Sequence, residues 1–362
     1  MRVLVAMSGG VDSSVAAYEL KRQGHDVIGV TIKTWPKEEC GQTGEKLCCS
    51  LEAVQFARSV AEDLGIRYYV TDLSEEFAKE IKTYFAQEYS RGRTPNPCIY
   101  CNSKIKFGYL LNKARMLGAE KLATGHYARI IRADGNYYLA EGVDKKKDQS
   151  YFLYDIPRDV LSSIEFPLGG YTKEKVRKIA LEQGLMTAQR PSSQDICFTS
   201  AGGDYREYLH ERGIKAFIQG DILDTEGSVV GKHMGIANYT VGQRKGLGLS
   251  FPEPVYVLKI DPERNIIVVG SKEQAMHKKI RIGGINRLTL DKFSKEEELD
   301  VKIRYATAKS PAIVTSKGKD EAIVEFKDPQ FAPTPGQAAV FYREEIVVGG
   351  GWIEEVMEIG SK

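Results

Sequence analysis

Two groups of residues carry side chains that could do chemistry. One is the run "MSGGVDSS" (7–14), which combines two glycines, three serines and Asp12. The other is the set of thiols at Cys98, Cys101 and Cys197. Glycines and hydroxyls placed between a strand and a helix favour a bound anion, because backbone N–H groups converge at a helix N-terminus. Sparse thiols in a long chain favour metal, redox or catalytic roles over structural bridges.

The glycine run departs from the two common phosphate-binding patterns. No lysine follows the glycines as in G-x-x-x-x-G-K-[ST], and the spacing G-x-G-x-x-G is missing from this position. A plain strand-to-helix turn, with Asp12 or Ser13 as the helix cap, is the structural alternative.

Elements that would position these residues follow from the apolar patterns. In the first half, strand patterns alternate with helix patterns; the strands are at 3–6, 27–32, 66–73 and 120–125, and the helices at 15–24, 50–65, 74–89 and 106–118. Such repeats predict a parallel sheet with helices on both faces. Ligands bind such sheets at the carboxyl ends of the strands, where the run 7–14 lies.

The chain is too long for one core, since it has 362 residues. After about Gly203 it becomes glycine-rich and short-stranded, and from about Met276 short alternating runs predict a β-barrel or sandwich. We therefore expect domains at 1–203, 204–276 and 277–362. The apolar runs are too short to cross a membrane and the start lacks a signal-peptide pattern, which predicts a cytoplasmic protein.

The cysteines leave several roles open. Cys98-x-x-Cys101 fits a zinc half-site, a redox pair or a cluster ligand, but the sequence has no second C-x-x-C to complete a four-cysteine zinc site. Cys48 and Cys49 precede an expected helix start, where loop packing is the simpler role, and the sequence does not assign Cys40.

The run 7–14 resembles the PP-loop of the N-type ATP pyrophosphatases. That resemblance implies that the loop holds the β- and γ-phosphates of ATP while the α-phosphate is attacked and pyrophosphate leaves, with Mg²⁺ neutralising charge. Asp12 would then help to hold Mg²⁺, and Ser8, Ser13 and Ser14 would donate to phosphate oxygens.

A longer series of motifs extends the resemblance from residue 3 to about 352. The motifs "RTPNPCIYCN", "ATGHYAR", "KDQSYFL", "SQDICF", "GKHMGIANYTVGQRKGLG" and "TPGQAAVFY" occur in this order. The chain is similar in them to the MnmA family of tRNA 2-thiouridylases. The resemblance implies an α/β protein: a PP-loop domain of the adenine nucleotide alpha hydrolase type, a small β-rich central domain and a C-terminal β-barrel. It implies a sulfurtransferase that adenylates C2 of the wobble uridine of tRNA with ATP and then replaces that oxygen with sulfur.

Site residues follow from the same resemblance. Those implied for ATP binding are Ala6, Met7, Ser8, Gly9, Gly10, Val11, Asp12, Ser13, Ile32 and Gly125. Cys197 would carry a persulfide and Cys101 would be its partner nucleophile, leaving a Cys101–Cys197 disulfide. The residues implied to meet the target base or the rest of the tRNA are Asn96, Pro97, Cys98, His126, Lys147, Asp148, Gln149, Arg304, Tyr305 and Gln337. The implied partners are tRNA and a sulfur-relay protein or cysteine desulfurase, and we expect a monomer.

Cys98 departs from the family pattern, in which many members have aspartate after "NP". A thiol is a poorer general base at neutral pH. Two versions stay open: persulfide transfer without a cluster, which is favoured, and a [4Fe–4S] cluster held by Cys98, Cys101 and Cys197.

Charge supports a nucleic-acid partner only locally, because the net charge is +2. Basic residues cluster at 104–106, 145–147, 244–245 and 278–281. The cluster at 145–147 lies next to "QSYF", whose aromatic rings suit stacking on unpaired bases. Two alternatives remain: a C–N-forming ligase with the same loop, which would not need the three thiols, and a non-enzymatic RNA-binding or nucleotide-sensing protein.

Overall fold

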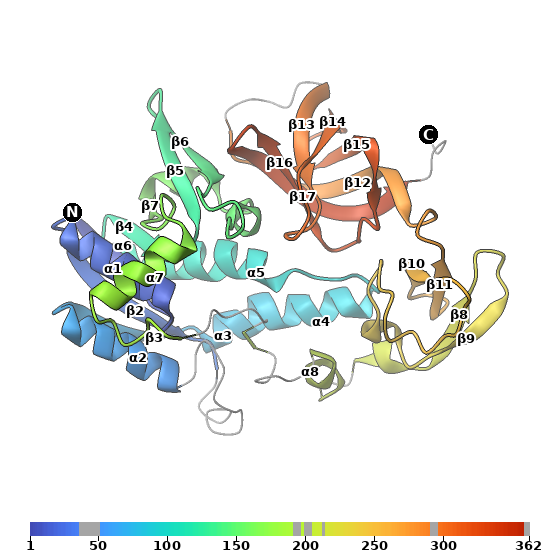
Figure 1. The fold of residues 1–362 in the computed structure, drawn as a ribbon, viewed down its shortest axis with the longest axis horizontal. Coiled ribbons are helices and arrows are strands. Elements are labelled where there is room, and N and C mark those ends of the chain that lie inside the picture. Colours follow the sequence, from blue (N-terminus) through green and yellow to red (C-terminus); the bar gives the residue numbers. More distant parts are fainter. Residues whose placement is uncertain (36–50, 191–196, 199–204, 212–213, 290–295, 358–362) are drawn as a thin grey trace. The chain divides into compact units, whose positions relative to one another are not determined.

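A computed structural model describes residues 1–35, 51–190, 197–198, 205–211, 214–289 and 296–357 (Figure 1). Contacts divide the chain into two units. The first comprises Met1–Lys82, Pro97–Asp204 and Glu345–Val347, and the second comprises Thr83–Asn96, Tyr205–Glu344 and Val348–Lys362. Within the described ranges, no helix combines the length and apolar composition that a membrane crossing needs.

The first unit is built on a parallel five-stranded sheet of order β3-β2-β1-β4-β7. Its strands are β1 (Arg2–Ala6), β2 (Asp26–Lys33), β3 (Arg67–Asp72), β4 (Lys121–Thr124) and β7 (Ile164–Glu165). Ala6, the last residue of β1, lies opposite Val30 on one side and Thr124 on the other. The carboxyl ends of the three central strands therefore meet at one edge. The predicted α/β class and parallel sheet are confirmed.

The first unit also contains several helices. They are α1 (Val11–Arg22), α2 (Leu51–Asp63), α3 (Ser74–Phe77), the π-helix η2 (Ala78–Lys82), α5 (Pro97–Tyr100), the π-helix η3 (Cys101–Leu110), α6 (Leu111–Met116), the 3₁₀ turns η4 (Ser150–Leu153) and η5 (Arg158–Ser163), and α7 (Lys173–Glu182). Val3 and Val5 of β1 share one apolar core with α1, α2 and α7, and α1 lies beside α7 (Figure 1). Leu4 points to the opposite face by strand alternation, and α6 contacts β4.

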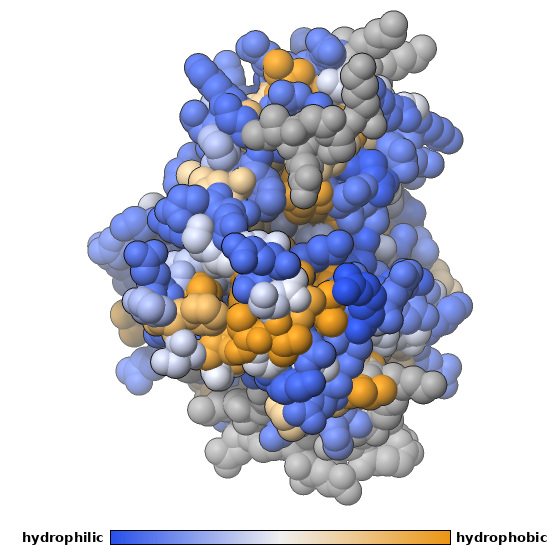
Figure 2. Space-filling model, turned by 90° about the vertical axis from the view of Figure 1, so that its right-hand side faces the viewer, coloured by the Kyte–Doolittle hydropathy of each residue, from blue (hydrophilic) through white to orange (hydrophobic). Residues whose placement is uncertain are grey.

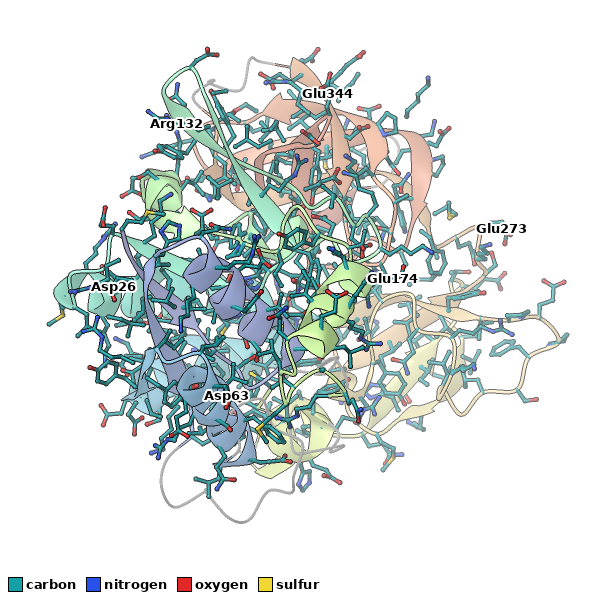
Figure 3. All side chains as sticks on the ribbon, turned by 60° about the vertical axis from the view of Figure 1, so that its left-hand side comes forward. Asp26, Asp63, Arg132, Glu174, Glu273 and Glu344 are labelled. Atoms are coloured by element: carbon teal, nitrogen blue, oxygen red, sulfur yellow. The ribbon has the colours of Figure 1, made fainter. Side chains whose placement is uncertain are left out.

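Charged side chains mark the outside of this unit. Asp26 begins β2, Asp63 ends α2, and Glu174 lies in the first turn of α7 (Figure 3). An acidic residue in a first turn is favourable because it opposes the positive end of the helix dipole.

A hairpin in the first unit was not among the sequence-based expectations. It pairs β5 (Ala128–Ala133) with β6 (Asn136–Glu141). Asp134 and Gly135 form its two-residue turn with φ of 50° and 75°. Asp-Gly is the pair that such a turn favours, since both positions need a positive φ.

The second unit begins with α4 (Thr83–Ser90) and continues with a small four-stranded sheet of order β10-β11-β8-β9. The elements are α8 (Tyr205–Glu211), η6 (Lys215–Phe217), β8 (Gly220–Leu223), β9 (Val229–His233), η7 (Ile236–Asn238), β10 (Tyr256–Asp261) and β11 (Ile266–Gly270). Helix α8 lies in a region expected to be β-rich. It forms because Tyr205 and Tyr208, one helical turn apart, both pack edge-on against Phe85 of α4.

The segment 218–251 exposes several large apolar side chains, among them Ile218, Val229 and Met234. Apolar residues gather on the face of the molecule drawn in Figure 2.

A six-stranded antiparallel barrel completes the second unit, as predicted. Its strands are β12 (Met276–Arg287), β13 (Glu296–Lys302), β14 (Ser310–Ser316), β15 (Glu321–Phe331), β16 (Ala338–Arg343) and β17 (Ile346–Met357). The order β12-β15-β14-β13-β16-β17 closes through pairing of β12 with β17. Alternate residues, such as Val324 and Phe326, fill the interior, which is the pattern of a small closed barrel.

Arg93 joins two parts of the second unit. Its Nε lies 2.7 Å from the Glu88 carboxylate and its Nη1 lies 2.5 Å from Glu354, and the Arg93 and Glu88 side chains are only 18% and 9% exposed. Replacing Arg93 leaves Glu88 buried with less compensation. We predict that Arg93→Met lowers the free energy of unfolding by about 3 kcal/mol in chemical denaturation. Lys232→Met, which breaks an exposed pair with Asp221, should lower it by less than about 1 kcal/mol. Equal losses would contradict the prediction.

Candidate functional site

The run 7–14 connects β1 to α1 at the edge where the central strands end. Gly9 has φ of 72°, and a Cβ there would lie 2.3 Å from the Ala53 carbonyl oxygen. A Cβ on Gly125, directly after β4, would lie 2.8 Å from the backbone of Asp12 and Ser13. Both positions therefore require glycine, because main chain packs against main chain there. We call the backbone of residues 7–14 with Gly125 the cradle.

Hydrogen bonds within the cradle shape the start of α1. The Ser8 N–H donates to Ser13 Oγ at 3.1 Å, and the hydroxyls of Ser13 and Ser14 each donate to the Gly10 carbonyl at 3.0 Å. Gly10 occupies the cap position, so neither Asp12 nor Ser13 caps the helix as the structural alternative assumed. The N–H groups of the first turn have no acceptor inside α1, which is the arrangement that favours a bound anion.

The Asp12 carboxylate is held by two groups from distant parts of the chain. Lys173 Nζ lies 2.6 and 2.7 Å from its two oxygens, and the Tyr127 hydroxyl donates to Oδ1 at 2.7 Å. Burial, together with the adjacent Asp12 charge, raises the pKa of Tyr127 far above its usual value. The hydroxyl therefore stays protonated and keeps donating to Asp12.

The rest of the cradle is fastened by Arg190. Its Nη1 donates to the Gly9 carbonyl at 3.1 Å, its Nη2 lies 3.3 Å from Glu52, and its guanidinium lies 4.2 Å from the ring centre of Phe56 in α2. One arginine thus ties the loop to α2.

The end of β2 lies beside the cradle. Thr31 Oγ1 donates to the Met7 carbonyl at 2.6 Å, and Ile32, half-buried, follows it. Just beyond the strand, Thr34 Oγ1 and Trp35 Nε1 are buried and have no hydrogen-bond partner in the described part of the chain. Buried polar atoms without partners are rare in native folds, and a nucleotide base could satisfy them.

The cysteine segments pack against a common helical stretch, Ser74–Lys82. Phe198, the neighbour of Cys197, packs edge-on against Phe77 of α3 with ring centres 5.7 Å apart. Cys101 begins η3, which contacts α3 and η2, and α5, which carries Cys98, contacts η2. Cys98 is exposed, whereas Cys101 and Cys197 are half-buried. π-Helical turns, such as those at Cys101 and in η2, are frequent at functional sites. Cys40, Cys48 and Cys49 lie outside the described residues.

The three thiols do not form a metal site in this conformation. Among the described residues, no three histidine, cysteine, aspartate or glutamate side chains are grouped so that they could hold a metal ion. The geometry of Cys98, Cys101 and Cys197 therefore does not support the iron–sulfur version.

The residues expected to contact tRNA in the first unit differ in accessibility. Lys147 is exposed and Gln149 half-buried, but His126 and Asp148 are buried. Asp148 accepts from the Gly142 N–H at 2.9 Å and from the Ser150 hydroxyl at 2.8 Å, which orders the turn around it. His126 Nδ1 lies 2.6 Å from Thr124 Oγ1, and burial lowers the pKa of His126 well below its usual range.

In the second unit, Gln337 donates to the carbonyls of Thr94 at 2.9 Å and Pro95 at 3.4 Å, directly before the half-buried Asn96. Arg304 donates to the carbonyls of Val241 at 3.1 Å and Ala332 at 2.6 Å, and Tyr305 is 36% exposed. Gln337 and Arg304 thus order local backbone, and their contact with tRNA stays a prediction.

Family models match almost the whole chain in three consecutive parts. They are described as a tRNA methyl transferase HUP domain (residues 1–201), a tRNA methyl transferase PRC-barrel domain (206–271) and an aminomethyltransferase β-barrel domain (277–353). A tRNA-specific 2-thiouridylase MnmA of Carboxydothermus hydrogenoformans is 48% identical over 359 residues, covering 98% of each chain. The corresponding protein of Moorella thermoacetica is 47% identical over 98% of this chain and 100% of its own.

The chain belongs to the MnmA family. Among solved structures, a 4-thiouridine synthetase–RNA complex with bound ATP is 20% identical, with a TM-score of 0.37 over 58% of this chain and 50% of that chain. A likeness at this level carries no argument about the site.

Sequence reasoning missed three residues of this MnmA-family site: Tyr127, Lys173 and Arg190. Lys173 carries only a local signal, because it follows the Thr172 cap of α7, whose Oγ1 accepts from the Lys175 N–H at 3.2 Å. That signal predicts a helix start. It cannot predict that α7 lies beside α1, which is a long-range contact.

Gly125 offers a test of the cradle. We predict that Gly125→Ala raises the KM for ATP about tenfold or more, because its Cβ would displace the first turn of α1, and even a 1 Å misplacement can be costly. Gly170→Ala is the matched control, since a Cβ there meets nothing within 4 Å. Steady-state kinetics with thermal melting would measure both. An unchanged KM in folded Gly125→Ala would remove Gly125 from the site.

His126 should make stability depend on pH. In the unfolded chain it binds a proton below its usual pKa of 6.5, whereas the folded chain keeps it neutral. Acid therefore favours unfolding. We predict that the free energy of unfolding falls below pH 6.5 by up to about 1.4 kcal/mol per pH unit. Denaturation of His126→Gln between pH 5 and 7.5 should show a shallower slope, and identical slopes would contradict the prediction.

Proposed function

We propose that this chain converts a uridine of tRNA to 2-thiouridine, using ATP to activate the C2 oxygen and a cysteine persulfide to supply sulfur. The observation that carries the proposal is the identity of 48% across nearly the whole length of a relative named as a tRNA-specific 2-thiouridylase. All three thiols and the cradle lie within the part that matches the HUP-domain model.

The cradle suits a nucleotide. Glycine at positions 9 and 125 leaves the space that a Cβ would fill, and the first turn of α1 presents N–H groups to phosphate. The hydroxyls of Ser13 and Ser14, which donate to the Gly10 carbonyl, can rotate to donate to phosphate oxygens instead. The adenine base can pack against Ile32 at the end of β2. Adenylation makes the C2 oxygen part of AMP, a good leaving group.

Mg²⁺ would supply charge neutralisation for the departing pyrophosphate. Asp12 is a suitable oxygen ligand and its side chain is 31% exposed. Both of its oxygens contact Lys173, so the ion would share this carboxylate with the ammonium group.

Sulfur transfer needs two thiols in this scheme. The terminal sulfur of the Cys197 persulfide attacks C2, and the C2–O bond breaks as AMP leaves. The Cys101 thiolate then attacks the Cys197 sulfur, so that the S–S bond to the base breaks, 2-thiouridine forms and the two cysteines become a disulfide. A thiol reductant restores them before the next turnover. Cys98 takes the position at which many family members have aspartate, beside the target base.

The remaining assignments complete the proposal. Asn96, Pro97 and Cys98 meet the target base, and His126, Lys147, Asp148, Gln149, Arg304, Tyr305 and Gln337 contact the rest of the tRNA. A sulfur-relay protein or cysteine desulfurase loads Cys197, and the enzyme works as a cytoplasmic monomer with domains at 1–203, 204–276 and 277–362.

The direct test is mass analysis of tRNA nucleosides. After incubation of unthiolated tRNA with the protein, ATP, Mg²⁺ and a sulfur source, we predict 2-thiouridine, with one AMP released per sulfur inserted. Cys197→Ala should abolish thiolation while tRNA-dependent ATP cleavage persists, because activation needs no sulfur. Cys98→Asp, which restores the residue common in the family, should keep thiolation. Thiolation by Cys197→Ala would refute the persulfide assignment, and no 2-thiouridine with the wild type would refute the function.

A further inference from the structure

Lys173 has hydrogen-bond contacts at both of its ends. Its ammonium group lies on the Asp12 carboxylate of the cradle, at 2.6 and 2.7 Å. Its backbone N–H donates at 2.9 Å to the carboxylate of Asp144, the first residue of the turn 144–149. One residue at the start of α7 thus contacts both the cradle and the turn.

Tyr127 makes a second connection between the same two places. The Gln149 N–H donates to the Tyr127 carbonyl at 2.8 Å, and the Tyr127 N–H donates to Gln149 Oε1 at 3.0 Å. The Tyr127 hydroxyl donates to Asp12 at 2.7 Å. The turn is therefore linked to Asp12 by two routes.

These links lie in the interior, whereas the outer side of the turn is open. Tyr127 is 3% exposed and the Lys173 side chain 12% exposed, so solvent screens their bonds to Asp12 less than it screens surface pairs. Lys145, Lys146 and Lys147 are exposed. The Lys146 N–H donates to the Asp144 carboxylate at 3.1 Å and the Lys147 N–H donates to the Asp144 backbone carbonyl at 3.0 Å, so the backbone of both lysines is tied to Asp144.

We propose that Lys173 is a positioning residue that couples tRNA binding at the turn 144–149 to ATP binding in the cradle. The proposal rests on the proposed function, since it takes the turn as a tRNA contact. A tRNA phosphate bound at the turn would restrict the position of Asp144. Because the Asp144 carboxylate accepts from the Lys173 N–H, the start of α7 would be restricted too, and with it the position of the Lys173 ammonium group on Asp12. Asp12 lies in the first turn of α1, so the N–H groups that meet ATP become ordered in advance. By linkage, ATP must tighten tRNA binding by the same factor.

The test measures that factor directly. The Kd of α,β-methylene-ATP, which cannot be cleaved at the reacting bond, is determined with Mg²⁺ in the presence and absence of saturating tRNA that lacks 2-thiouridine. The wild type should bind the analogue about fivefold or more tightly with tRNA. In Lys173→Met, which leaves only the Tyr127 route, the ratio should fall about twofold or more while the melting temperature shows a folded protein. A wild-type ratio of one, or an unchanged ratio in Lys173→Met, overturns the proposal.

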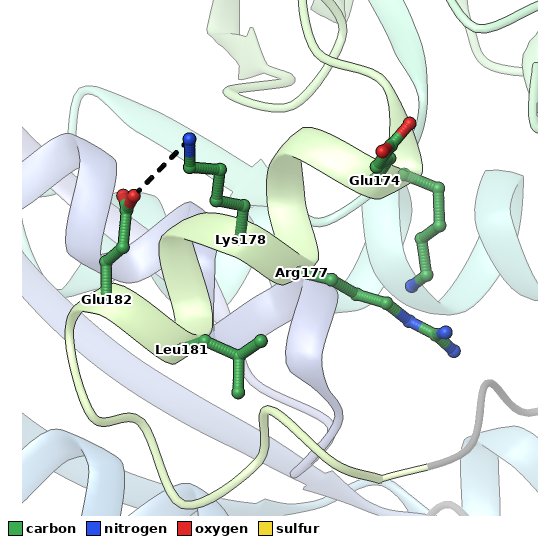
Figure 4. Close-up of a pocket in the computed structure, with 6 residues that line it drawn as sticks. Glu174, Arg177, Lys178, Leu181 and Glu182 are labelled. Carbon is green, nitrogen blue, oxygen red and sulfur yellow. Dashed lines mark ion pairs between the residues drawn. The ribbon is translucent and has the colours of Figure 1, made fainter.

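Controls separate position from charge. Lys178→Met removes a lysine of the same helix that is 67% exposed and pairs with Glu182 at 3.7 Å, and it should keep the wild-type ratio (Figure 4). Lys173→Arg, which retains the cation, should keep most of it. If Lys173→Met fails to fold, Tyr127→Phe carries the test, with a reduced ratio expected and an unchanged ratio overturning the proposal. Equal loss in Lys178→Met would also overturn it.

The two proposals fail differently. Coupling between the analogue and tRNA without any 2-thiouridine formed from ATP and a sulfur source refutes the function and leaves the coupling standing. Thiolation by a wild type that shows no coupling refutes the coupling alone.

Discussion

The carboxylate of Asp12 is the point at which three separate parts of the first unit meet. The first turn of α1 supplies the carboxylate, the segment after β4 supplies the Tyr127 hydroxyl, and α7 supplies the Lys173 ammonium group. Because the ammonium group is largely buried, removing either charge leaves the other poorly compensated. The same contact places a lysine beside a glycine-rich run whose own sequence lacks one. That lysine comes from α7, far away in the sequence.

Around that contact, backbone approaches backbone more closely than side chains allow. Gly9 packs on Ala53 of α2 and Gly125 packs on the first turn of α1, and Arg190 closes the loop from outside. The thiols are organised separately, on segments that pack against Ser74–Lys82. The cradle and the thiols thus lie on different elements of one unit.

Patterns that repeat along the chain were reliable guides. The alternation of apolar strands and helices predicted the parallel sheet, and the period-two runs after residue 276 predicted the barrel, since both patterns record which face of each element is buried. The hairpin at 128–141 was missed although Asp134-Gly135 carries the usual turn signal. Helix α8 was not predicted because it is short and precedes a glycine-rich segment. Its stability comes from aromatic packing on α4, far away in the sequence.

The sequence alone drew attention to the run 7–14 and the three thiols, because short motifs make them recognisable, and the roles of these residues stay predictions. The series of family motifs indicated the class of reaction, which the similarity to 2-thiouridylases supports. Tertiary structure alone decided what surrounds them. Asp12 and Lys173 are 161 residues apart, and nothing local to either predicts their contact. Only the packing of α7 beside α1 brings them together. The burial of His126 and Asp148 was decided in the same way: both lie in polar-looking motifs, but the folded chain covers them, since exposure depends on every neighbouring element rather than on residue type.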